Sequence, residues 1–189
     1  MQAREQYVEA NVRYFLPTNS LFQYIYSSRV IYGAEYDCQI WKPISGWVGV
    51  DYYTSSGHSL GLSNPTHIYF IPVILGLKYS FDLNWGSFYF GAGAVGTYVH
   101  IRDHSAFVIP TSSKWTFGGL GKGGFLIDLP KSIFLDLFAV WMSTHVNFYN
   151  TDHGEVTRHT GLLNNWSFGG GIGYKFGAAC PAEQNCASP

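Results

Sequence analysis

Histidine, acidic and serine side chains gather in the segments that separate the apolar stretches of this 189-residue chain. The seven histidines are His58, His67, His100, His104, His145, His153 and His159. Asp103, Asp152 and Glu155 lie among them. Imidazole binds metal ions and acts as a general base beside a serine, so this set permits a metal site or a hydrolase site at one end of the molecule. A simpler interpretation is that the histidines are solvated, and no His-x-Ser-Asn element follows from His145.

A second group of ionisable residues falls inside the apolar stretches themselves. Its members are Glu9, Arg13, Glu35, Asp37, Asp51, Lys78, Lys122, Asp136 and Lys175. Each lies opposite the apolar stripe when its segment is read as a strand. A charge buried without a partner costs several kcal/mol, so we predict a network of ion pairs across an interior. Most members lie near the short turns, where the network should plug that interior.

Eight segments alternate between apolar and polar residues with a period of two, which is typical of strands. Two of these segments form the stretch 66–101, which is interpreted as a hairpin with its turn near Phe81–Asn84. The other strands are expected at 7–16, 30–41, 47–54, 114–127, 133–145 and 165–176. Connections 17–29, 55–65, 102–113 and 146–164 are long, whereas 42–46, 81–87 and 128–132 are short. This alternation predicts an all-β fold, an eight-stranded antiparallel up-and-down transmembrane β-barrel.

Composition supports a lipid-facing barrel. Charged residues make up only 12% of the chain, and aromatic residues 18%. The face opposite the charges is nearly free of polar residues, whereas a soluble lipocalin-like barrel, the alternative, would place its charges outside. The net charge of −1 provides no basic stripe for nucleic acid.

Aromatic residues near the strand ends are predicted to form two girdles at the membrane interfaces. The girdle at the short turns comprises Trp41, Trp47, Tyr79, Trp85, Phe88, Tyr174 and Phe176. The girdle at the long loops comprises Tyr98, Trp115, Trp141 and Trp166.

One barrel domain is expected over 1–176, followed by a tail at 177–189. In the tail, Cys180 and Cys186 either close a small disulfide loop or remain free thiols. Cys38 falls on an apolar face and is interpreted as a small hydrophobic residue. The N-terminus shows no apolar signal segment, so we interpret the sequence as a mature chain.

Three short stretches resemble the small outer-membrane β-barrel family, which includes OmpX, the OmpA barrel, OmpW and opacity-type proteins. They are Ile71–Tyr79, Tyr89–Ala94 and the strand end Gly171–Phe176. In the last stretch, Gly171, Gly173, Tyr174 and Phe176 are similar to the aromatic-terminated signal that the barrel assembly machinery recognises. The chain departs from the family in continuing for 13 residues beyond Phe176.

The resemblance implies a location in the outer membrane of Gram-negative bacteria, with extracellular long loops and periplasmic termini. It implies outer-membrane lipid, lipopolysaccharide and the assembly machinery as partners, with host or matrix ligands bound through the long loops. No cofactor, metal or catalytic residue is expected.

The preferred function is that of a structural or surface-interaction protein, similar to an adhesin. One alternative is OmpW-like binding or uptake of a small hydrophobic molecule in an apolar pocket above the charges. The candidate pocket residues are Phe70, Pro72, Ile74, Leu120, Phe138, Val140 and Met142. A second alternative is an enzyme that modifies lipid A at the loop histidines.

Overall fold

The structure is a computed structural model that describes residues 5–18, 29–58, 65–103, 111–152 and 155–177. Within these ranges the strands are β1 (Gln6–Pro17), β2 (Val30–Trp41), β3 (Ile44–His58), β4 (Pro65–Leu83), β5 (Gly86–Asp103), β6 (Thr111–Asp128), β7 (Ile133–Asp152) and β8 (Glu155–Phe176). A 3-10 turn, η1 (Pro130–Ser132), joins β6 to β7. No helix in the described part of the chain is long and apolar enough to cross a membrane.

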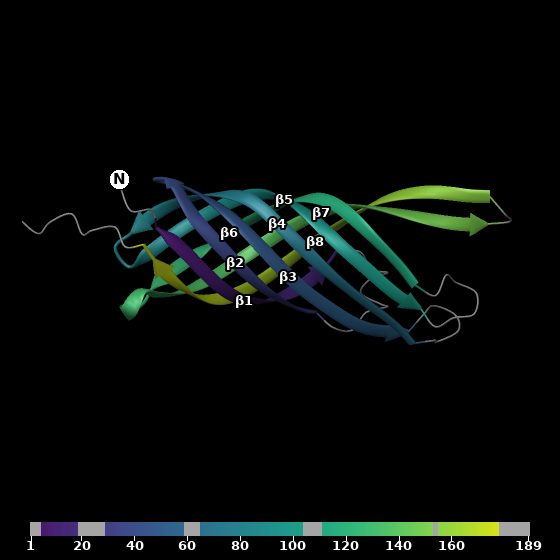
Figure 1. The fold of residues 1–189 in the computed structure, drawn as a ribbon, viewed down its shortest axis with the longest axis horizontal. Helices are drawn as coiled ribbons and strands as arrows, with labels where there is room; N and C mark the ends of the chain where they lie inside the picture. Colours follow the sequence, from purple (N-terminus) through teal and green to yellow (C-terminus); the bar gives the residue numbers. More distant parts are fainter. Residues whose placement is uncertain (1–4, 19–28, 59–64, 104–110, 153–154, 178–189) are drawn as a thin grey trace, which may run out of the picture.

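Each strand pairs antiparallel with its neighbours in sequence, and β1 closes the sheet on β8 (Figure 1). The closing register runs from Gln6↔Phe176 to Pro17↔Asn165. The predicted all-β, eight-stranded up-and-down barrel is therefore confirmed. The start of β1 and the end of β8 share one end of the barrel with the tight turns, and we call this end the short-turn rim.

Side-chain exposure shows which surface faces lipid. Leu75 and Phe117 point outward, and each is 69% exposed. Valine, leucine, isoleucine and aromatic side chains cover the outside of all eight strands, while Glu35, Asp51 and Lys122 are buried. This distribution is the reverse of a soluble barrel and suits a surface in contact with hydrocarbon, so it argues against the lipocalin-like alternative.

The β7–β8 hairpin corrects one prediction. Residues 146–164 were expected to form a loop, but the two strands stay paired from Ile133↔Tyr174 to Asp152↔Glu155. The hairpin passes the last pair that β7 makes with β6 (Gly118↔Thr144) and projects from the barrel (Figure 1). The prediction failed because a strand pair that has left the wall faces neither lipid nor core, so it needs no apolar stripe.

Other boundaries also move outward. β3 continues to His58 and β6 begins at Thr111, so the loops that follow and precede them are shorter than expected. The turn of the β4–β5 hairpin is Asn84–Trp85, a little beyond the predicted Phe81–Asn84.

Trp47 was predicted to join the aromatic girdle at the short turns, and this is wrong. Its side chain points into the barrel and is only 2% exposed. Trp47 shares its strand face with Asp51, and its ring fills space that a Cβ atom at Gly76 or Gly91 would occupy. The other predicted members of that girdle are exposed: Trp41, Tyr79, Trp85, Phe88, Tyr174 and Phe176.

Charge placed on the outer face at mid-strand should destabilise the barrel in lipid. We expect Leu75→Arg to lower the free energy of unfolding by about 2–4 kcal/mol, because the guanidinium would face hydrocarbon. The matched control is Leu83→Arg at the turn end of the same outward face, where the cost should be about 0–1 kcal/mol. Urea unfolding in lipid vesicles measures both losses. Equal losses would contradict the lipid-facing assignment of Leu75.

Candidate functional site

Glu35 is the centre of the charged interior. Lys122 Nζ lies 2.9 Å from both carboxylate oxygens of Glu35, and Lys78 Nζ lies 3.0 Å from Oε2. Each lysine also has a second carboxylate partner inside the barrel: Lys78 pairs with Asp37 at 3.0 Å, and Lys122 pairs with Asp136 at 3.4 Å. Strands β2, β4, β6 and β7 thus hold one chain of alternating charges across the barrel.

Two further contacts extend this layer. Arg13 on β1 forms an ion pair with Asp51 on β3, and both side chains are buried. Asn11 Nδ2 donates a hydrogen bond of 3.2 Å to Glu9 Oε1. Among the described residues no lysine or arginine nitrogen lies within 4.0 Å of Glu9, so its carboxylate lacks the partner that the sequence interpretation expected.

Aromatic rings surround the ammonium groups of this layer. Lys78 Nζ lies 5.1 Å from the ring centroids of Trp47 and Tyr89, and Lys122 Nζ lies 3.9 Å from that of Phe138. Tyr89 also donates a hydrogen bond of 2.6 Å to Asp136. Cation–π attraction strengthens when the charge is desolvated, so these rings help to compensate the buried lysines. Neither Trp47 nor Tyr89 was predicted to belong to this layer, although their positions opposite the apolar stripe placed both inside.

Lys175 departs from the predicted network. Its ammonium pairs with Asp128 at 2.5 Å, and its side chain is 27% exposed at the short-turn rim. Asp128 was assigned to a turn, whereas the structure extends β6 to that residue. The pair therefore lies at the mouth of the barrel, outside the buried layer.

The candidate pocket residues belong to the packed interior. Ile74, Leu120, Phe138 and Val140 form one hydrophobic cluster with Trp47, Tyr89 and Val95, and Met142 packs against it. Phe70 belongs to a second cluster with Phe15, Ile31 and Tyr53. Pro72 is also fully buried. These contacts show side chains meeting where the sequence interpretation left open a cavity.

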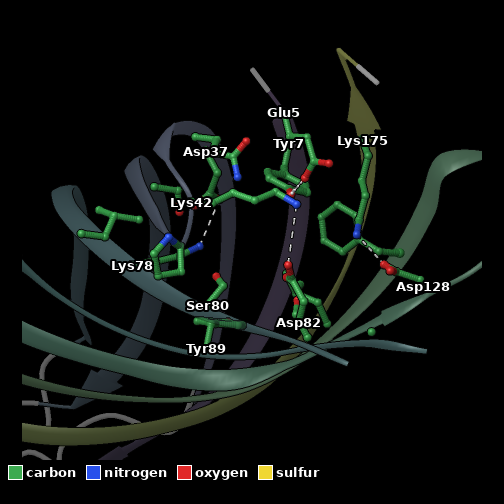
Figure 2. A pocket seen from close by; sticks show the side chains of 18 of the residues that line it. Glu5, Tyr7, Asp37, Lys42, Lys78, Ser80, Asp82, Tyr89, Asp128 and Lys175 are labelled. Carbon is green, nitrogen blue, oxygen red and sulfur yellow. Dashed lines mark hydrogen bonds and ion pairs between the residues drawn. The ribbon is translucent and has the colours of Figure 1, made fainter. Parts of the chain in front are cut away.

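A cavity does lie at the short-turn rim, and we call it the vestibule (Figure 2). Its volume is about 210 Å³, and residues at the ends of all eight strands line it. Lys42 and Asp82 face each other across its mouth at 3.8 Å, and Lys78 and Tyr89 lie at its inner end (Figure 2). The vestibule is polar and charged, unlike the apolar pocket that was considered as an alternative at the opposite end.

Two of the histidines each pair with a serine on the outside of the barrel. His67 Nδ1 lies 3.0 Å from Ser56 Oγ, and His100 Nδ1 lies 2.7 Å from Ser113 Oγ. His145 is exposed on β7, and His104 and His153 lie outside the described residues.

No cluster of three or more potential metal ligands occurs in the described ranges. Cys180 and Cys186 fall outside those ranges, so the disulfide stays a prediction.

The glycines near the end of β8 have a packing role beside the predicted assembly signal. A Cβ atom at Gly171 would collide with the carboxylate of Glu9, and one at Gly173 would collide with the ring of Phe134. Tyr174 and Phe176 are exposed on the outer face, where their rings stack. The end of β8 therefore makes room for interior side chains while it presents aromatic rings outside.

Removing the carboxylate of Glu35 should destabilise the barrel far more than removing a rim carboxylate. We expect Glu35→Gln to lower the free energy of unfolding by about 3–5 kcal/mol, because two buried lysines lose their shared anion. Asp82→Asn is the control, since its exposed pair with Lys42 should contribute about 0–1 kcal/mol. Urea unfolding in the same lipid or detergent measures both. A loss of under about 1 kcal/mol for Glu35→Gln would contradict the central role of Glu35.

Comparison with known proteins returns matches at the level of structure. No protein-family model and no curated protein sequence matches the chain. Neisserial surface protein A superposes with a TM-score of 0.61 at 14% identity, covering 90% of this chain and 97% of that one. The outer membrane protein AlkL gives a TM-score of 0.62 at 15% identity, with coverage of 96% and 94%.

A third neighbour is Ail, the attachment invasion locus protein of Yersinia pestis, solved with the heparin analogue sucrose octasulfate. It superposes with a TM-score of 0.58 at 10% identity, covering 93% of this chain and all of that one (100%). At such low sequence identity the superpositions show a shared fold and nothing about function. The closed eight-stranded wall, the apolar outer face and these neighbours agree, and the chain has the fold of the small outer-membrane β-barrels.

Proposed function

We propose that this protein is an integral outer-membrane β-barrel that acts at the cell surface, as an adhesin-like interaction protein, through its β7–β8 ribbon. The ribbon is defined as residues 145–152 of β7 and 155–164 of β8. The observation that carries the proposal is the length of this hairpin beyond the barrel wall. The interior and the outer face supply its anchor in the membrane.

The outer-membrane location rests on the apolar exterior and the fold. A wall whose exposed residues are mostly valine, leucine and aromatic side chains is stable only against lipid. In barrels of this kind the short turns face the periplasm and the longer hairpins face the outside. The ribbon would then project from the cell, and both ends of the barrel domain would lie in the periplasm.

A closed interior favours a surface role over transport. The chain of contacts through Asp37, Lys78, Glu35, Lys122 and Asp136 spans the barrel from β2 to β7. Hydrophobic side chains fill the next level. With eight strands the interior is just wide enough for side chains to fill it, so little room for a pore remains.

Among the described residues, the edges of the ribbon pair with no other strand, although the Asn164 carbonyl at its base accepts the Thr18 amide at 3.2 Å. β6 stops pairing with β7 at Thr144, and β1 stops pairing with β8 at Asn165. Beyond these residues the ribbon's outer backbone groups have no neighbouring strand among the described residues. Free strand edges accept extended peptides by β-augmentation, and two-sided access suits contact with a large partner.

Uptake of a hydrophobic molecule is less well supported. The residues expected to line its pocket contact one another, and the vestibule that the structure does contain is polar. The likeness to AlkL is one of fold and adds no argument for uptake. A lipid A-modifying activity would depend on the exterior serine–histidine pairs, Ser56 with His67 and Ser113 with His100.

The closed interior predicts that the barrel does not conduct ions. Purified protein reconstituted in planar bilayers should give no steady open-pore current, even in 1 M KCl, because buried pairs are screened much less than exposed ones. A porin of about 16 strands, reconstituted from the same lipid and detergent, provides the positive control, because barrels of that size leave an aqueous channel. A steady, reproducible current from this protein would contradict the closed interior.

Removing the ribbon should abolish surface binding without disturbing the barrel. We expect bacteria that carry a variant with residues 146–163 replaced by a two-residue turn to adhere to immobilised matrix proteins no better than cells lacking the protein. The control replaces the same residues with an unrelated hairpin of equal length. It separates the effect of the ribbon's sequence from the effect of its length beyond the barrel wall. Heat-modifiable gel mobility verifies that both variants fold. Wild-type adhesion by the folded short variant would count against the proposal.

A further inference from the structure

The vestibule contains more acidic than basic side chains. The carboxylates in its lining belong to Glu5, Glu9, Asp37, Asp82 and Asp128, and the ammonium groups belong to Lys42, Lys78 and Lys175. Each of these lysines already has a carboxylate within 4.0 Å: Asp82 for Lys42, Asp37 for Lys78 and Asp128 for Lys175. The two carboxyl groups of the lining that have no lysine nitrogen within 4.0 Å among the described residues are those of Glu9 and Glu5, and the Glu5 carboxylate accepts a hydrogen bond from the Tyr7 hydroxyl.

Glu9 is the residue whose charge stands out. It is only 4% exposed, it lines the vestibule, and it accepts a hydrogen bond from Asn11. The buried layer around it repeats the imbalance, since Glu9, Glu35, Asp37, Asp51 and Asp136 face only Arg13, Lys78 and Lys122. A buried carboxylate that no cation contacts within 4.0 Å is stabilised when a counter-ion reaches it, and the vestibule provides the path.

Aromatic rings form part of the same lining. Tyr7, Tyr89 and Phe134 all contribute to the vestibule. These rings already hold ammonium groups of the chain: Lys175 Nζ lies 5.4 Å from the Tyr7 centroid and 6.0 Å from that of Phe134. Lys78 Nζ lies 5.1 Å from the centroid of Tyr89. Aromatic faces next to a carboxylate are the surroundings that ammonium ions prefer.

We propose that the vestibule binds a small organic ammonium ion, with its charged nitrogen against Glu9 and its carbon chain along the aromatic rings. The cavity of about 210 Å³ is larger than one desolvated metal ion fills. In the described residues no cluster of three or more potential metal ligands is present, so a tightly held metal is the weaker fit. The excess of carboxylates would repel an anion.

The test uses the full chain refolded in octyl glucoside, a detergent without an ammonium headgroup. The probe is 1,4-diaminobutane, titrated by calorimetry at low salt, with binding followed in parallel by the aromatic NMR signals of Tyr7 and Tyr89. We expect saturable binding in the wild type and a loss of affinity of about tenfold or more in Glu9→Gln, because a charge-assisted contact is removed.

The matched control is Asp82→Asn, which removes a carboxylate at the mouth that is exposed and already paired with Lys42. Its loss of affinity should be smaller than that of Glu9→Gln, since the Asp82 carboxylate is exposed to water and already pairs with Lys42. Glu9→Gln is expected to refold because glutamine has the same size and its amide oxygen can still accept the hydrogen bond from Asn11. If it does not refold, the wild-type titration still decides, since unmoved Tyr7 and Tyr89 signals overturn the proposal.

Three results overturn the assignment. The first is the absence of saturable binding to the wild type, as expected if Glu9 is simply protonated. The second is an equal loss in Asp82→Asn and Glu9→Gln, which would indicate diffuse attraction to the rim. The third is displacement of the diamine by Mg²⁺ at matched ionic strength, which would identify a divalent-cation site.

Discussion

The contact between Glu35 and the ammonium groups of Lys78 and Lys122 is the interaction on which the barrel depends. A wall that faces lipid on its outside has to turn every mid-strand charge inward, and there each charge needs a partner. Glu35 meets two lysines from strands that are not its neighbours in the sheet, so the contact forms only when the sheet has closed. The inward parity of the charged residues, their pairing and the closure of the sheet therefore depend on one another.

Because charged and aromatic side chains fill the narrow interior, some strand positions next to them must be glycine. Trp47 lies over Lys78 because Gly76 and Gly91 have no Cβ atoms in the way of its ring. At the other side of the barrel, the space beside Gly171 holds the carboxylate of Glu9. The glycine content of the strands reflects this packing as much as any need for flexibility.

The two ends of the molecule differ because the wall ends differently at each. At the short-turn rim the strands finish together, and their last residues enclose a polar vestibule that opens from the buried charge layer. At the other end β7 and β8 continue as a pair after β6 and β1 have left them. The first arrangement suits a small ligand and the second a large one.

The sequence by itself determined the strand number, the inward parity of the charges and the apolar outer face. The reason is that side chains of a membrane-spanning strand alternate between lipid and interior, so apolar residues recur at every second position. It also determined the inward parity of Trp47, which the assignment to the girdle overlooked. Only the tertiary structure decided that Glu35, 43 residues from Lys78, is its partner and that, among the described residues, no lysine or arginine nitrogen lies within 4.0 Å of Glu9. Those contacts depend on the stagger at which the sheet closes, and no local pattern encodes that stagger. The same holds for the ribbon, since pairing beyond the membrane leaves no apolar stripe to mark it.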